Sequence, residues 1–371
     1  MGQSGIRPLA HSVTVSPSHA LRGLSPRGII CALLIVALVR FGCLALYPLT
    51  DTTEARYGSI ALQMTVTGDW IVPHISPGEP FLGKPPLSFW MSAIGIELFG
   101  VNAFAARLGP FLAAALTVAL TILLGTRLWG RAAGLLAGLV LATLGLFHVS
   151  AGMVMTDPAL AASLALSMVA LPMSVTSTSH TARRLWGHGL FVGLGLGLLA
   201  KGPVALVLAG LSLTLWGAWR RPWAELRSLP WITGPGLMLA IAAPWHILTE
   251  MRSPGFLDSY LVGEHIRRFL EPAWESPYGD AHEHPRGVIW LYWLTGAMPW
   301  GLIALFTLPF PAHRAATRSA LRAEPWLSYL LCWALAPALF FTISRNIMLT
   351  YVLPSAAPVA LLATRALAGP A

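Results

Sequence analysis

Long apolar runs separated by short polar segments repeat along almost the whole chain. A helix needs roughly 20 apolar residues to cross a bilayer, and most of these runs approach or reach that length. The pattern predicts an all-α fold, a polytopic transmembrane bundle of about ten spans. The predicted spans are Ile29–Pro48, Leu108–Thr126, Ala132–Ser150, Pro158–Ser174, His188–Ala200, Val204–Trp219, Trp231–Leu248, Val288–Phe310, Trp326–Ile343 and Thr350–Leu367.

One of these runs and one further apolar segment are shorter than a span. His188–Ala200 is short for a full crossing, which favours a tilted or partly re-entrant helix. Leu87–Phe99 has about 13 residues and carries aromatic side chains suited to the headgroup level. We interpret Leu87–Phe99 as an interfacial or re-entrant helix, because counting it as a span would place every later arginine cluster outside.

Composition supports a membrane protein and excludes several other classes. Hydrophobic residues make up 56% of the 371 residues and charged residues only 11%, against about 25% charged in soluble domains. The net charge of +9 comes mostly from arginines in short loops, so membrane topology explains it better than nucleic acid binding does. The three cysteines form no CxxC pair, which argues against a disulfide framework or a zinc knuckle.

Charge also predicts the topology. Residues 1–28 are rich in Ser, Pro and Gly and read as a disordered cytoplasmic tail, and residues 29–371 form the membrane domain. If each span crosses once, the arginine clusters fall on the cytoplasmic side, as the positive-inside rule requires. The two large outer loops then lie at about 49–107 and 249–287. Of the fifteen acidic residues, all but Glu225 and Glu324 fall on or near the outer side, which favours a site that handles charge on that face.

Several charged residues of the outer segments are candidates for chemistry. Asp51 and Glu54 follow the first span directly, and either could act as a base or orient a substrate. Lys84 is held by two prolines just before the interfacial segment and is suited to binding a lipid phosphate. Asp157 and Lys201 lie in tight turns between apolar runs, where ionisable groups are usually functional. Each also has an ordinary structural reading: a loop acid, a snorkelling lysine, a helix cap or a wet turn.

The second outer loop adds a basic and acidic cluster. On an amphipathic helix, Glu264, Arg267 and Arg268 would share one face, and adjacent arginines near the headgroups suit phosphate recognition. An ordinary surface ion-pair set is the alternative. His265, together with His282 and His284, could bind a divalent metal, although no helical HxxxH pair supports this.

Seven sequence pieces occur in one order along the chain. They are DTTEARY from Asp51, PFLGKPP from Pro80, FGVNAFAAR from Phe99, MTDP from Met155, LAKGP from Leu199, GEHIRRFL from Gly263 with YG at Tyr278 and HEHPRG from His282, and NIMLTYVLP from Asn346. Together they resemble the GT-C-type membrane glycosyltransferases that include the lipid A 4-amino-4-deoxy-L-arabinose transferases and the protein O-mannosyltransferases.

This resemblance implies a substrate set and a place. The donor would be a sugar on undecaprenyl phosphate, and the acceptor a lipid A-type glycolipid or a protein. Transfer would occur at the periplasmic face of the bacterial inner membrane, among membrane lipids and without nucleic acid. It assigns Asp51, Glu54 and Asp157 to catalysis and Lys84, Arg268, Arg345 and Tyr351 to the donor phosphate. It leaves Arg56, Tyr57, Lys201, Glu264 and His265 as further site candidates.

The sequence departs from the family pattern at two positions. Relatives usually carry an Asp-Glu pair before x-Arg-Tyr, and here Thr53 stands at the Asp position, which leaves open whether Asp51 or Glu54 is the key acid. Many aminoarabinose transferases have Glu before the Lys-Pro, and here it is Gly83. No cofactor is implied with certainty, and a divalent metal at His265 stays open. The alternatives are a non-enzymatic transporter or flippase of lipid-linked sugar and an inactive, truncated family member.

Overall fold

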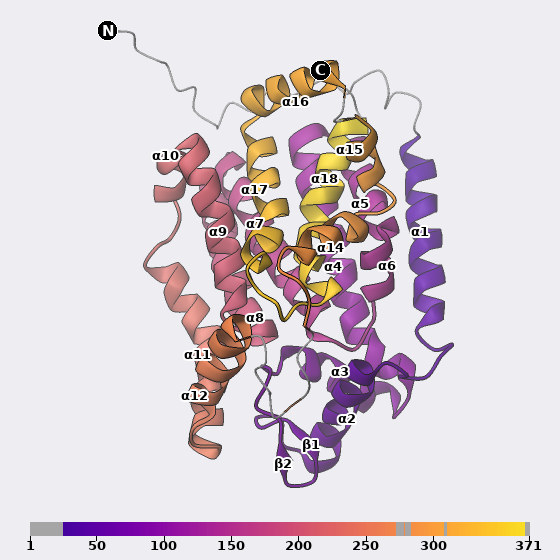
Figure 1. Cartoon of the computed structure of the whole chain (residues 1–371), viewed down its shortest axis with the longest axis vertical. Helices are drawn as coiled ribbons and strands as arrows, with labels where there is room; N and C mark the ends of the chain where they lie inside the picture. The colour runs from indigo at the N-terminus through magenta and orange to yellow at the C-terminus, as the bar shows by residue number, and fades with distance from the viewer. Residues whose placement is uncertain (1–24, 272–277, 279–282, 308–309, 368–371) are drawn as a thin grey trace.

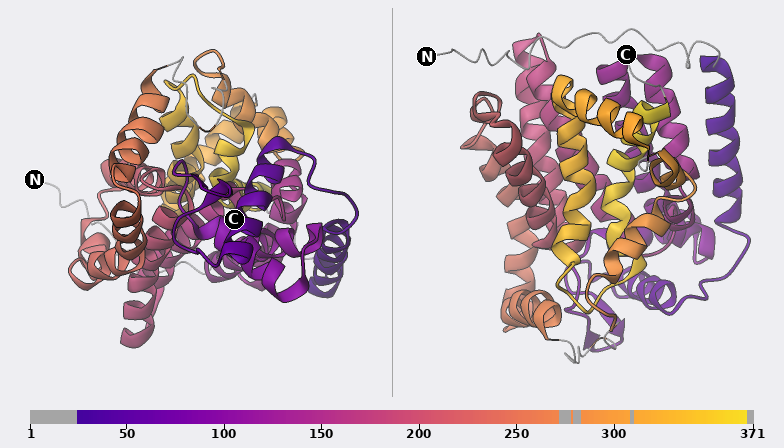
Figure 2. Two further views of the ribbon diagram at one scale, coloured as in Figure 1. Left: turned by 90° about the horizontal axis from the view of Figure 1, so that it is seen from below. Right: turned by 45° about the horizontal axis from the view of Figure 1, so that its top comes forward.

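The computed structural model describes residues 25–271, 278, 283–307 and 310–367 (Figure 1). Long helices run side by side along the long axis of the molecule (Figures 1 and 2). The helices of this bundle are α1 (Pro26–Cys43), α4 (Ala103–Trp129), α5 (Arg131–Thr143), α6 (Gly145–Ser150), α7 (Thr156–Thr176), α8 (His180–Lys201), α9 (Val204–Arg220), α11 (Thr233–Arg252), α14 (Val288–Gly296), α15 (Gly301–Thr307), α17 (Pro325–Phe341) and α18 (Ala356–Leu367). The helical fold class is therefore confirmed. Most of the predicted disordered tail, residues 1–24, lies outside the described residues.

Helix α7 is the centre of the bundle. Of its most apolar 18-residue stretch, 89% is buried inside the protein, and it packs against α4 and α8. Gly193 of α8 allows this close approach, because a Cβ there would lie 2.3 Å from Ser167 Oγ and 2.6 Å from the carbonyl oxygen of Ser163. A helix that is apolar on all sides belongs in the middle of a membrane bundle.

Three helices, α1, α4 and α7, are long and apolar enough to cross a membrane, within the described residues. A fourth is added if Thr317–Ala323 and Pro325–Phe341, which meet at 111°, count as one bent span. The chain is therefore a multi-pass membrane protein, and the full set of about ten crossings stays a prediction. The predicted run His188–Ala200 is part of a longer helix, α8. This helix begins earlier because the polar residues before the run are also helical, and Ser179 caps its N-terminus.

The loops predicted to lie on opposite sides occupy opposite ends of the molecule (Figure 1). One end carries α2 (Thr52–Thr67), α3 (Leu87–Phe99) and a small hairpin of β1 (His74–Ser76) and β2 (Glu79–Pro80). The other end carries the arginine-containing helices α10 (Trp223–Arg227) and α16 (Pro311–Ala323). The interfacial segment Leu87–Phe99 was predicted with the bounds that α3 has, whereas the hairpin was not predicted.

Candidate active site

A cavity of about 330 Å³ has both a charged and an apolar wall. Its residues come from the loop before α3, from the end of α8 and from α9, from η2 (Ser259–Arg267) and α13 (Arg268–Leu270), and from α17, η3 (Leu349–Ser355) and the segment between them. The polar lining is Lys84, Lys201, Glu264, His265, Arg268, Ser344, Asn346 and Tyr351, and the apolar lining is Pro203, Val204, Val207, Ile266, Phe269, Leu270, Phe340 and Phe341. The cavity thus joins three cationic side chains to a wall that suits a hydrocarbon chain. We call it the donor cavity.

Lys84 and Arg268 meet at one carboxylate. The Nζ of Lys84 lies 3.5 Å from Oε2 of Glu264, and Nη1 of Arg268 lies 2.9 Å from the same oxygen. Burial lowers the pKa of Lys84 to about 8, although the negative charge of Glu264 opposes this shift. Three of the residues predicted from sequence are therefore in contact, and two cations converge where an anion can be held.

A second ion pair lies beside this one. The Nζ of Lys201, at the last position of α8, lies 2.6 Å from Oδ1 of Asp157 in the first turn of α7. The same ammonium lies 4.4 Å from the centre of the Tyr351 ring, an attractive cation–π distance. Asp157 is buried, so it reaches the donor cavity through Lys201, which lines the cavity directly.

Arg56 and Tyr57 bring helix α2 toward this region. Tyr57 is buried against Phe81 and Phe89, with ring centres 5.9 and 5.1 Å apart. Burial raises the pKa of Tyr57, and the charge of Asp157 raises it further. Arg56 donates a hydrogen bond to the carbonyl oxygen of Tyr278. Neither residue is part of the lining of the donor cavity.

Asp51 and Glu54 have other contacts in the structure. The exposed Asp51 is the N-cap of α2, and its carboxylate accepts hydrogen bonds from the backbone amides of Thr53 (2.8 Å) and Glu54 (3.3 Å). The buried carboxylate of Glu54 binds the guanidinium of Arg107, with Oε2 2.8 Å from Nη2, and accepts the amide of Val154 at 3.0 Å. Neither acid lines the donor cavity.

Arg107 is the residue of this region that sequence reasoning missed. Its side chain is fully buried and also donates to the carbonyl oxygens of Leu44 (3.1 Å), Tyr47 (2.6 Å) and Pro48 (3.1 Å). It therefore ties the end of α1, the start of α2 and the body of α4 together. The signal was present in the sequence, because Arg107 ends the piece FGVNAFAAR, next to an apolar run where an arginine is costly unless it is paired.

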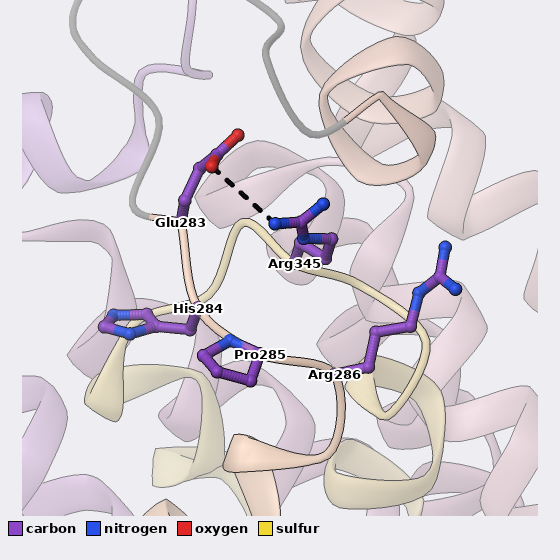
Figure 3. Close-up of a pocket in the computed structure, with 5 residues that line it drawn as sticks. All are labelled: Glu283, His284, Pro285, Arg286 and Arg345. Atoms are coloured by element: carbon purple, nitrogen blue, oxygen red, sulfur yellow. Dashed lines mark ion pairs between the residues drawn. The ribbon is translucent and has the colours of Figure 1, made fainter.

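Arg345 lies apart from the other residues predicted to bind phosphate. It lines a second cavity of about 500 Å³ with Glu283, His284, Pro285 and Arg286 (Figure 3). Its neighbours in sequence, Ser344 and Asn346, line the donor cavity instead. The guanidinium of Arg345 is 3.9 Å from Oε2 of Glu283, which is a loose ion pair.

His265 is not placed as a metal ligand. Its Nδ1 lies 2.7 Å from the carbonyl oxygen of Tyr260 and its Nε2 lies 3.2 Å from that of Lys201. Within the described residues no group of three His, Cys, Asp or Glu side chains could hold a metal ion, and His282 lies outside them. At Gly83 an added Cβ would lie 2.8 Å from the Tyr278 ring, so tyrosine occupies the space of a further carboxylate. A divalent metal at His265 therefore stays a prediction.

The sequence and the fold both have relatives. The chain is 32% identical over 363 residues to undecaprenyl phosphate-alpha-4-amino-4-deoxy-L-arabinose arabinosyl transferase 1 of Pseudomonas fluorescens, which covers 96% of this chain and 60% of the relative. A Pseudomonas aeruginosa relative with the corresponding name is 32% identical over 352 residues, 91% of this chain and 59% of its own length. The chain thus spans about 60% of the length of these curated relatives.

Solved structures extend the likeness to three dimensions. The crystal structure of ArnT from Cupriavidus metallidurans bound to undecaprenyl phosphate superposes with a TM-score of 0.81 at 28% identity, covering 91% of this chain and 60% of that one. The oligosaccharyltransferase AglB of Archaeoglobus fulgidus shares the fold at a TM-score of 0.53 and 13% identity, over 91% of this chain and 50% of that one. Residues 30–260 match the family model described as dolichyl-phosphate-mannose-protein mannosyltransferase, and the chain therefore belongs to that family.

Proposed function

We propose that this chain is a glycosyltransferase that uses a sugar on a polyprenyl phosphate. The donor cavity carries the proposal, because it holds three cations beside an aromatic and aliphatic wall. A polyprenyl phosphate has the matching chemistry, a compact anion on a long hydrocarbon. The names of the relatives and the lipid in the ArnT crystal structure support undecaprenyl phosphate as the carrier.

Charge management is the main task of such a site. In the reaction an acceptor oxygen forms a bond to the anomeric carbon, and the bond from that carbon to the phosphate oxygen breaks with its electron pair. The departing lipid phosphate gains negative charge, which Lys84, Arg268 and Lys201 are placed to stabilise. Each group that stabilises charge in this way typically raises the rate by roughly two to three orders of magnitude.

Glu264 is the residue that the donor phosphate would have to displace. Its Oε2 occupies the point between Lys84 and Arg268, where a phosphate oxygen would accept the same hydrogen bonds. The ring of Tyr351 lies against the ammonium of Lys201 and helps to hold it in position. In this arrangement Glu264 keeps the two cations positioned between turnovers and assists release of the product phosphate.

The acids divide into two roles in this account. Asp157 is the carboxylate that we favour as the positioning residue of the site, since its Oδ1 holds the ammonium of Lys201 at 2.6 Å. Asp51 and Glu54 instead position the first outer loop, the former as a helix cap and the latter through Arg107. If the acceptor is a hydroxyl group, its proton must pass to a carboxylate; an ionised phosphate acceptor needs no such transfer.

The finer topology is part of the same proposal. With ten spans and the arginine clusters on the cytoplasmic side, the N-terminus would lie in the cytoplasm and the donor cavity at the periplasmic face of the bacterial inner membrane. The separation of α2 and α3 from α10 and α16 supports it (Figure 1). A transporter or flippase would instead need its charges at the middle of the bilayer.

The transfer assay uses the purified full chain in lipid nanodiscs. The first donor is undecaprenyl phosphate-linked 4-amino-4-deoxy-L-arabinose, the acceptor is lipid A, and both lipid products are measured by mass spectrometry. We expect Lys84→Met to lower the rate at least about 100-fold. The control Arg252→Gln removes an exposed arginine that pairs with Asp69 outside both cavities and should keep the wild-type rate. Wild-type transfer by Lys84→Met would contradict the assignment of the donor cavity.

A further inference from the structure

Helix α16 lies across the end of the bundle and does not continue along it. Its last turns, Thr317–Ala323, meet α17 at 111°, and Figure 1 shows α16 crossing the ends of the neighbouring helices. Because α17 runs with the bundle and is largely buried in it, α16 runs roughly in the plane of the membrane. This is the position of an interfacial helix.

Contacts around Glu324 fix the bend between the two helices. Its Oε1 accepts a hydrogen bond from Nε of Arg365 in α18 at 3.0 Å, and its Oε2 accepts one from Nε1 of Trp129 at the end of α4 at 3.1 Å. The side chains of Glu324 and Arg365 are only 16% and 11% exposed. The bundle therefore holds the start of α17, and α16 keeps a defined orientation.

The arginines of α16 lie on one face of the helix. Arg314, Arg318 and Arg322 are spaced by four residues, which places them on the same side of a helix, and all three are exposed. Ala320 lies on the opposite side and is half-buried, so the arginine face is turned away from the bundle. The sequence of α16 contains no acidic residue.

The end of α9 adds two further arginines. The guanidinium of Arg220 donates hydrogen bonds to the carbonyl oxygen of Arg322 at 3.3 and 3.4 Å, so the ends of α9 and α16 are joined. The next residue, Arg221, is exposed. We call Arg220, Arg221, Arg314, Arg318 and Arg322 the basic surface. The acid that follows α16, Glu324, is already paired with Arg365 and does not neutralise this surface.

Tryptophans beside the basic surface indicate its depth in the membrane. Trp219 directly precedes Arg220 and is 49% exposed, and Trp223 in α10 is 52% exposed. Exposed tryptophans are concentrated at the level of the lipid headgroups. The basic surface therefore lies at the level of the lipid phosphates, and guanidinium groups bind phosphate through paired hydrogen bonds.

We propose that the basic surface binds the headgroups of anionic phospholipids. The inference goes beyond the proposed function, because the surface includes no residue of the donor cavity and lies at the end of the bundle opposite α2 and α3 (Figure 1). A zwitterionic headgroup carries a cation of its own, which the arginines repel, so the surface favours lipids with net negative charge. Each arginine near an anionic membrane surface strengthens binding by about fivefold.

A fluorophore on α16 measures this binding locally in the full chain. Cys31→Ala, Cys43→Ala and Cys332→Ala remove the native thiols, and Thr317→Cys carries an environment-sensitive fluorophore. The labelled protein in non-ionic detergent is titrated with phosphatidylglycerol and with phosphatidylcholine of the same acyl chains. We expect phosphatidylglycerol to bind about tenfold more tightly or better. This preference should decrease as salt is added, because salt screens exposed charges.

Variants of α16 decide whether the arginines cause the preference. Arg314→Gln, Arg318→Gln and Arg322→Gln combined should abolish it, whereas lysine at the same three positions should keep most of it, because the charge remains. Arg252→Gln, at the other end of the molecule, should behave as wild type. Equal affinity of the wild type for the two lipids, or an unchanged preference in the glutamine variant, would contradict the inference. Inorganic phosphate or a single-stranded oligonucleotide that displaces phosphatidylglycerol at equal concentration would show a general anion site and overturn the lipid assignment.

Discussion

The ammonium of Lys201 lies 2.6 Å from the carboxylate of Asp157, and both side chains are largely buried between α7 and α8. Removing one partner of a buried pair leaves the other charge without compensation, at a cost of about 3–5 kcal/mol. We expect Asp157→Asn and Lys201→Met each to lower the thermal unfolding temperature in detergent. The double variant should lose less than the sum of the two, because the uncompensated charge is then absent. Strict additivity would show that the pair is not coupled.

The buried pair of Glu54 and Arg107 predicts a different behaviour for the two acids of the first outer loop. Arg107→Met should destabilise the protein by about 3–5 kcal/mol, because Glu54 would stay buried without its partner. Asp51→Asn should cost less than about 1 kcal/mol, since asparagine also caps helices well. Thermal unfolding of the two variants compares them directly. A larger loss for Asp51→Asn than for Arg107→Met would contradict the structural role of Glu54.

The pKa of Lys84 makes donor binding dependent on pH. Burial lowers this pKa to about 8 in the free protein, and a bound phosphate anion favours the charged amine and raises the pKa again. Binding therefore takes up a proton above pH 8. The Kd for undecaprenyl phosphate should be nearly constant from pH 7 to 8 with respect to this group. It should then rise by up to about tenfold per pH unit.

Lys84→Arg is the control for this titration. Arginine stays charged throughout the range, so its variant should lose the dependence above pH 8 even if its affinity is lower. Isothermal titration in nanodiscs at pH 7, 8, 9 and 10 measures both proteins. A wild-type Kd that does not change between pH 8 and 10, or an arginine variant with the same slope, would show that Lys84 does not contact the phosphate.

The proposed orientation predicts which cysteines an impermeant reagent can reach in intact cells. A cysteine at Glu79, in the exposed hairpin, should be labelled from the periplasm. A cysteine at Arg318, in α16 at the opposite end, should be labelled only after the inner membrane is opened. The reverse pattern would place the donor cavity in the cytoplasm.

Sequence predicted the helices of this fold better than its irregular parts. The bounds of α3 matched because a short apolar run between prolines and a glycine has clear limits, and the arginine clusters identified the loops that share an end. The break of the run Ala132–Ser150 at Leu144, where α5 ends and α6 begins, was not predicted. Leu144 is apolar like its neighbours, so hydropathy cannot reveal an extended residue in that position.

The site was predicted in part for a similar reason. Lys84, Lys201, Glu264, Arg268 and Tyr351 were candidates because charged or polar groups beside apolar runs are conspicuous, and they line one cavity. The division between Arg345 and its neighbours could not be predicted, since it depends on the path of the irregular backbone between α17 and η3. Nor could the pairing of Glu54 with Arg107, which are 53 residues apart in sequence.

The central claim is that the donor cavity binds a polyprenyl phosphate through Lys84 and Arg268. A cryo-electron microscopy structure of the full chain in nanodiscs with saturating undecaprenyl phosphate tests it most directly. The account predicts phosphate density within hydrogen-bonding distance of both Lys84 Nζ and the Arg268 guanidinium, with the polyprenyl chain along Phe340 and Phe341. Phosphate density in the cavity of Arg286 and Arg345 with none between Lys84 and Arg268, or no density at either place, would contradict it.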